Sequence, residues 1–130
     1  MLVSGAINAA NELRAGNRIA ESTKRRWLLS LDKRIYEEII LVHEGSENVS
    51  EPDDYTSKDS TLLLPDTYSD VYVWYLVSQI DLALAETERY YNSSGRFNSL
   101  YSAFERRYTR EHMPLQKHRL HNVMRVRGVK

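Results

Sequence analysis

The stretch Thr67–Tyr91, TYSDVYVWYLVSQIDLALAETERYY, lies within the longest run of the sequence without glycine or proline. Its middle, Val71–Val77, is rich in β-branched and aromatic residues, which favour strands. However, an apolar spacing of three to four residues continues through the whole stretch and indicates a helix, whereas strands usually end within about ten residues. Thr67 and Asp70 match a capping box at its start. We predict one central helix of about 25 residues, covered on several sides by other helices or another subunit.

The composition indicates a single globular domain. The chain has 130 residues, no cysteine, and eighteen basic against eighteen acidic residues. Without cysteine there are no disulfides, thiol nucleophiles or thiolate metal sites, and the balanced charge gives no global field for nucleic acid. The N-terminus lacks the pattern of a signal peptide. The longest apolar stretch, Val71–Ile80, is about half of the ~20 residues that a bilayer requires. We therefore expect a soluble protein that is cytoplasmic where it is made.

Charge is sorted along the chain. Residues 14–34 contain seven basic and two acidic side chains, and residues 105–130 contain eight basic and two acidic ones. Residues 44–70 contain eight acidic side chains and a single lysine. Such blocks are either solvated surfaces or complementary surfaces that stack copies of the chain, or the chain and its partners, head to tail.

Three further helices are predicted from apolar spacing and end signals. The first runs from a Ser4 cap to Leu13 and stops before Gly16. The second covers about residues 23–43, capped by Ser22 or Thr23, and Gly45 is placed to be its left-handed C-cap. After a break or bend at residues 92–95, the third presents an apolar face and ends near His112. That face consists of Phe97, Leu100, Tyr101, Phe104 and Tyr108. The predicted fold class is all-α, a small helical bundle around a long central helix.

Two segments lie outside this helical pattern. Residues 44–60 have no apolar period and form an expected long, exposed acidic loop, which we interpret as an interaction surface because long loops in compact domains tend to be functional. Its candidate interaction residues are Asp53, Asp54 and Asp59. The short apolar run Leu62–Leu64 that follows is expected to be a brief strand or a plug packed on the core. From this division we expect a helical domain at residues 1–114 and an extended, mobile basic tail at residues 115–130.

The tail ends in an alternating segment. Its candidate interaction residues are Val123, Met124, Arg125, Val126 and Arg127. Alternating apolar and basic side chains are typical of a strand with one buried and one wet face. Such a segment can complete the edge of a partner's sheet, and a disordered, solubilising tail is the equal alternative.

The sequence contains no arrangement that indicates catalysis. His118 and His121 lack nearby carboxylates or cysteines to complete a metal site, and GxSxG, HExxH and phosphate-binding glycine loops are absent. Asp81 beside the apolar stripe is expected to pair with Arg89 or Arg96. We therefore predict no enzyme activity, no metal and no cofactor.

The middle of the chain resembles a known family. The resemblance rests on residues between Leu63 and Tyr108: LLPDTY at Leu63–Tyr68, then Val71-Tyr72, Tyr75-Leu76, Gln79-Ile80-Asp81, Glu86, Arg89-Tyr90, Asn92-Ser93, Phe97-Asn98, Tyr101, Phe104 and Tyr108. This set is similar to the head–tail connector (adaptor, or head-completion) proteins of long-tailed bacteriophages and of prophages in Gram-positive bacteria. The segment from Trp27 to Gly45 resembles the first long helix of that family, whereas residues 117–130 are longer and more basic than its members suggest.

The resemblance implies a structural virion protein without catalysis. It implies an all-α fold whose copies form a ring of about a dozen subunits beneath the portal after DNA packaging. The ring offers a platform to the next connector, stopper or tail protein, and the tail residues named above would then dock on the portal. DNA in the channel would be contacted only weakly and non-specifically, and no membrane is implied. Two other classes stay open: a small prophage-encoded DNA-binding or regulatory helical protein, and a hydrolase accessory protein or enzyme.

Overall fold

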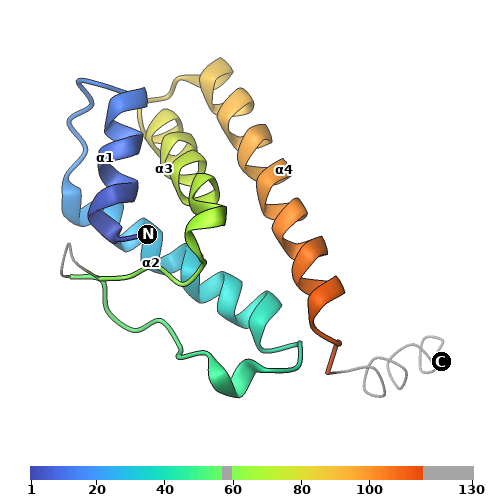
Figure 1. Ribbon diagram of the computed structural model, residues 1–130. Helices are drawn as coiled ribbons and strands as arrows, with labels where there is room; N and C mark the ends of the chain where they lie inside the picture. Colours follow the sequence, from blue (N-terminus) through green and yellow to red (C-terminus); the bar gives the residue numbers. More distant parts are fainter. Residues whose placement is uncertain (57–59, 116–130) are drawn as a thin grey trace, which may run out of the picture.

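The computed structural model describes residues 1–56 and 60–115, and in these ranges the protein is an all-α bundle (Figure 1). The four α-helices described are α1 (Val3–Leu13), α2 (Glu21–Ile35), α3 (Ser69–Ala83) and α4 (Thr87–Glu111). Three short helices join them: a π-helix η1 (Tyr36–Ile40), and the 3-10 helices η2 (Ser46–Asn48) and η3 (Asp66–Tyr68). Two isolated antiparallel bridges pair Leu2 with Thr61 and His43 with Pro114.

The predicted single helix over residues 67–91 is wrong, because the chain turns back between α3 and α4. Ala85 adopts a left-handed conformation with φ of 59°. The Glu86 N–H donates to the Asp81 carbonyl at 2.9 Å and the Ala85 N–H donates to the Leu82 carbonyl at 3.1 Å. These two bonds form a Schellman C-cap, a motif that usually has glycine at the left-handed position. Because alanine stands there, the sequence carries no stop signal.

The longest described helix is α4, and it runs through residues 92–95, where we predicted a break. Ser93 is buried and turns its hydroxyl inward, toward Asp81 Oδ2 at 2.8 Å and the Arg89 carbonyl at 2.8 Å. Gly95 is exposed and has open space around it. The turn-forming residues are therefore accommodated within the helix because one of them makes a tertiary contact. The predicted end near His112 is confirmed, since α4 ends at Glu111.

The helix predicted over residues 23–43 exists with a change of geometry. It begins at Glu21 after Ala20, so Ser22 and Thr23 are not its caps, and it becomes the π-helix η1 after Ile35. The capping box at Thr67 is also absent, because α3 begins after Tyr68 without a side-chain cap. In contrast, the predicted left-handed glycine is confirmed: Gly45 has φ of 91°.

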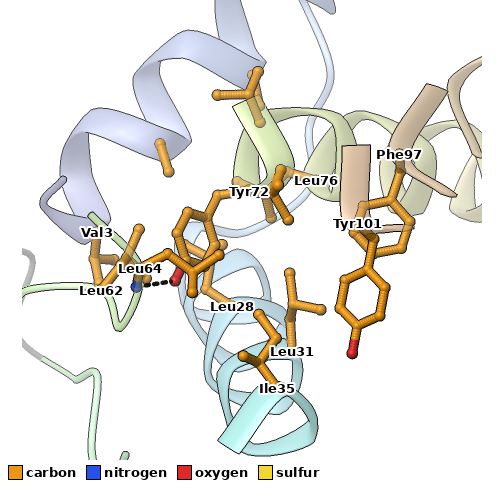
Figure 2. Close-up of a cluster of buried hydrophobic side chains, with 14 of the residues drawn as sticks. Val3, Leu28, Leu31, Ile35, Leu62, Leu64, Tyr72, Leu76, Phe97 and Tyr101 are labelled. Carbon is orange, nitrogen blue, oxygen red and sulfur yellow. Dashed lines mark hydrogen bonds between the residues drawn. The ribbon is translucent and has the colours of Figure 1, made fainter. Parts of the chain in front are cut away.

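The core lies around α3, which contacts α1, α2 and α4. Its central position agrees with the prediction that residues 71–77 are covered on several sides, and other helices of the same chain cover them. Figure 2 shows Tyr72 and Leu76 of α3 among side chains of α1, α2 and the segment before η3. Leu62 and Leu64 are both 3 % exposed, so this run is a plug on the core. The predicted apolar face of α4 is confirmed: Phe97, Tyr101 and Phe104 are buried.

Candidate functional site

The acidic loop is fastened to the bundle at a buried carboxylate, Asp32 of α2. Asp32 is fully buried, and its oxygens accept hydrogen bonds from the hydroxyls of Tyr55 and Tyr72 and from the Leu63 N–H. Burial raises the pKa of Asp32, although these hydrogen bonds act in the opposite direction. Burial also raises the pKa of both tyrosines. At neutral pH the hydroxyls therefore stay protonated and donate to Asp32.

This anchor corrects the expectation of a loop without core residues. Tyr55 is 7 % exposed and belongs to the hydrophobic core. Asp53 and Asp54 next to it are exposed, as the interaction hypothesis requires. Asp54 accepts hydrogen bonds from the backbone N–H and the hydroxyl of Thr56, at 3.0 and 3.2 Å, which forms a local turn. Asp59, the third candidate, lies outside the described residues.

A second buried carboxylate, Asp81 of α3, joins three helices at one end of the bundle. Arg14, directly after α1, donates from Nε to Asp81 Oδ1 at 2.7 Å and from a terminal nitrogen to Oδ2 at 3.1 Å. Ser93 of α4 donates the third hydrogen bond. The predicted partners were wrong: the guanidinium of Arg96 lies over the Trp74 ring instead, 4.8 Å from its centroid. The hydrogen bond to Asp81 raises the pKa of Arg14 further, so the ion pair persists at neutral pH.

Exposed apolar side chains cluster beside this ion pair. We call the cluster the turn end; it consists of Leu13, Leu82, Leu84 and Tyr91. Leu82 and Tyr91 are 53 % and 69 % exposed and line the same shallow pocket as Asp81. Acidic Glu86 and Glu88 lie in the same turn and the first turn of α4.

A second exposed apolar cluster lies at the other end of α4. We call it the tail end; it consists of Leu41, Met113 and Leu115. The backbone is fixed here by two hydrogen bonds, from Glu44 N–H to the Met113 carbonyl at 2.8 Å and from Leu115 N–H to the Val42 carbonyl at 2.9 Å. The 25 residues of α4 span about 37 Å, and Figure 1 shows α4 running from the α3–α4 turn at one end of the bundle to the other end.

His43 is buried beneath the tail end. Its Nδ1–H donates to the Ile39 carbonyl at 2.6 Å, which leaves Nε2 to pair with the Thr109 hydroxyl at 3.1 Å. Tyr108 packs edge-on against the His43 ring and stacks on the ring of His112 at 3.9 Å between centroids. From the sequence, His43 is placed only at the end of the helix predicted over residues 23–43. Its side-chain hydrogen-bond partner Thr109 comes from α4, 66 positions further along the chain.

An apolar groove opens at the tail end, between α4 and residues 40–65. It has a volume of about 260 Å³, and all but two of its lining side chains are aliphatic, aromatic or proline. Five of these are Ile40, Val49, Leu63, Pro65 and Tyr108. Glu111 and His112 are the polar members of the lining.

The remaining predicted site residues cannot be placed. Val123–Arg127, like His118 and His121, lie outside the described residues. Within residues 1–56 and 60–115, no three His, Asp or Glu side chains are grouped so that they could hold a metal ion. None of the described helices has the length and apolar character needed to cross a membrane.

Comparisons with protein-family models, with curated proteins and with solved structures give no match for this chain.

Proposed function

We propose that this protein is a structural virion protein, a head–tail connector or adaptor of a bacteriophage or prophage. About a dozen copies form a homo-oligomeric ring beneath the portal after DNA packaging. The ring provides the platform for the stopper or tail, and it meets DNA only non-specifically as the DNA passes through its channel. The protein resides in the host cytoplasm during assembly and in the virion afterwards.

The observation that carries this proposal is the pair of exposed apolar clusters at opposite ends of one rigid bundle. A subunit of a ring needs two different surfaces, because each copy contacts one neighbour with one surface and the other neighbour with the second. The turn end and the tail end are two such surfaces, held apart by α4. Large exposed apolar side chains are typical of interaction sites when they cluster. Neither cluster is needed for the core, which lies around α3.

The acidic loop adds a third surface of one charge sign. Its exposed carboxylates lie beside the Tyr55 anchor, so the backbone that presents them is held in place. A fixed acidic surface suits a neighbouring copy or a portal with basic side chains, and it selects against partners of like charge. Because such exposed pairs are individually weak, we expect the free protein to be monomeric at micromolar concentration and the ring to form on the portal.

The test is to mix the purified protein with portal rings from the same genome. Sedimentation is expected to show a monomer alone and a larger complex with the portal, and electron microscopy is expected to show an added ring. Portal genes directly upstream of this gene would support the same role. A mixture that never co-sediments would contradict it.

Variants at the two ends sharpen this test. Leu84→Glu at the turn end and Met113→Glu at the tail end change exposed side chains, so both variants are expected to fold. In a ring with head-to-tail contacts, the turn end of each copy meets the tail end of the next, so either variant alone removes every contact. A mixture of the two variants retains one kind of intact contact, between the tail end of Leu84→Glu and the turn end of Met113→Glu. Added to portal rings, the mixture is therefore expected to bind as pairs of subunits without completing a ring. Rings of normal size from either variant alone would contradict the assignment of the two ends.

A small DNA-binding regulator is the second candidate, and one observation favours it. A hollow of about 230 Å³ beside α2 is lined by Arg25, Arg26, Ser22 and Thr56, side chains that can contact phosphate, together with Leu29, Tyr55 and the acidic Asp54. This candidate predicts a salt-dependent shift of duplex DNA at sub-micromolar protein. The connector predicts no such shift.

A further inference from the structure

The groove at the tail end has no occupant among the described residues, although it is apolar and partly enclosed. Its volume of about 260 Å³ is below the roughly 300–1,000 Å³ of sites that enclose drug-sized ligands. A space of this size and lining suits a few aliphatic side chains of a peptide segment. We propose that the occupant in the free protein is the C-terminal segment of the same chain, residues 116–130.

The first argument is the position of the chain. The described residues end at Leu115, whose N–H is bonded to the Val42 carbonyl. His112, three residues earlier, lines the groove. Residue 116 is four positions beyond His112, a span of at most about 14 Å, so it starts close to the groove. The fifteen residues that follow can extend about 50 Å, which is enough to return to it without strain.

The second argument is charge. Residues 116–130 contain five basic side chains and no acidic one. Residues 44–56, which flank the groove through Val49, contain five acidic side chains and no basic one. The start of this acidic segment lies against the groove, because a Cβ at Gly45 would be 3.7 Å from the His112 ring. Glu111, the acidic side chain of the groove lining, is already paired with Arg107 at 3.1 Å.

The third argument is the alternation within the segment. In an extended peptide, successive side chains point to opposite sides. Met124 and Val126 can then enter the apolar groove while Arg125 and Arg127 face the acidic residues 44–56. Basic flanks with apolar anchors match the acidic rim and apolar floor, whereas an acidic or wholly polar segment would not. In the free protein, the docked segment therefore occupies the groove.

The test uses the absence of cysteine in the chain. In the full-length protein, Val49→Cys and Met124→Cys are combined, and crosslinking by a short bismaleimide is followed by mass spectrometry at low micromolar concentration. The matched control pairs Met124→Cys with Ser102→Cys, which is exposed on α4, lies outside the groove lining and is within reach of the segment. Docking is expected to crosslink the groove pair within one chain at least roughly tenfold faster than the control pair, which experiences only the effective concentration set by the linker.

Charge reversal and salt identify the cause. Arg125→Glu with Arg127→Glu in the same cysteine pair, or added salt, is expected to reduce the crosslinking rate toward that of the control pair. Equal rates for the two pairs, or a crosslinked dimer in place of a crosslinked monomer, would overturn the proposal. The dimer would assign the groove to the segment of a second copy. The experiment contains no portal, so it stands or fails independently of the connector role.

Discussion

The Tyr72 hydroxyl donates a hydrogen bond to Asp32 Oδ1 at 2.7 Å and accepts one from the Leu64 N–H at 2.7 Å (Figure 2 shows the second bond). One phenol thus connects the central helix α3, the helix α2 and the plug that follows the acidic loop. Asp32 has no basic partner in these contacts, and three donors satisfy it instead. The position of the loop therefore depends on hydrogen bonds to a buried carboxylate.

Replacing Tyr72 by phenylalanine is expected to lower the free energy of unfolding by about 1–3 kcal/mol. The ring is retained, but a buried oxygen of Asp32 loses a donor and the Leu64 N–H loses its acceptor. Chemical denaturation followed by circular dichroism measures the change. The matched control is Tyr36→Phe, because the half-buried Tyr36 hydroxyl makes no hydrogen bond with the described residues; it is expected to change stability by less than about 0.5 kcal/mol. Equal losses in the two variants would contradict the role of the hydroxyl.

The raised pKa of Asp32 predicts a pH dependence with a defined sign. Its folded-state pKa lies above the ordinary value of about 3.9, so within that interval the folded protein binds more protons than the unfolded chain. The contribution of Asp32 to stability is therefore greatest at low pH and decreases as pH rises through the folded-state pKa. Denaturation of the wild type and of Asp32→Asn across pH 4–8 is expected to show the wild type gaining stability relative to the variant as pH falls. A relative gain as pH rises would contradict this prediction.

Arg14→Ala is expected to destabilise the protein by about 3–5 kcal/mol, because it leaves the Asp81 carboxylate buried without its charged partner. The control is Arg25→Ala, which removes an ion pair to the half-exposed Glu21 and is expected to cost about 0–1 kcal/mol. Adding Asp81→Asn to Arg14→Ala is expected to recover part of the loss, since the unpaired charge disappears. If the double variant is less stable than Arg14→Ala alone, the ion-pair explanation fails.

Two glycines give opposite predictions for the same substitution. Gly95→Ala is expected to stabilise the protein by about 0.5–1 kcal/mol, because Gly95 lies inside α4 and a methyl group there meets open space. Gly45→Ala is expected to destabilise it, because Gly45 has φ of 91°, in a region where a Cβ is strained. Melting temperatures of the two variants measure the difference. If Gly95→Ala instead destabilises the protein, residues 92–95 are not continuous helix and the predicted break is supported.

Reversing Asp53, Asp54 and Asp59 to lysine is expected to leave helicity and melting nearly unchanged while blocking assembly of infectious particles. The reason is that Asp53 and Asp54 are exposed and only Asp54 makes a local turn, so the fold rests on the neighbouring Tyr55. Complementation of a phage that lacks this gene measures assembly, and Asp53→Lys alone serves as a milder control. An unfolded triple variant would assign the loop a structural role instead.

The sequence by itself determined the fold class and most of the buried faces. Apolar spacing predicted α1, most of α2 and the face of α4 around Phe97 and Phe104, because burial of one helical stripe follows directly from a repeat of three to four residues. It also predicted a left-handed glycine at Gly45, since few residues other than glycine adopt that conformation without strain, although Gly45 precedes η2 and Leu41 is the C-cap of η1.

The two buried carboxylates were partly visible in the sequence but could not be paired from it. Asp32 stands four residues after Leu28 on an apolar face, and Asp81 follows Ile80, so each interrupts a hydrophobic stripe. The sequence order gives no distance to the partners, and Arg14 lies 67 positions from Asp81. The sequence favoured Arg89 and Arg96 because they follow Asp81 most closely along the chain, whereas the tertiary partner is Arg14.

Only the tertiary structure decided where α3 ends and α4 begins. Residues 67–91 carry helix-forming patterns on both sides of Ala85, and no glycine or proline marks the turn. Antiparallel packing of α4 on α3 buries Ser93 against Asp81, and this contact fixes a left-handed alanine that local propensity alone disfavours. The same contact holds residues 92–95 in a helix. Local sequence determined most of the helical residues, whereas long-range burial and one shared carboxylate decided where the chain reverses and kept residues 92–95 helical.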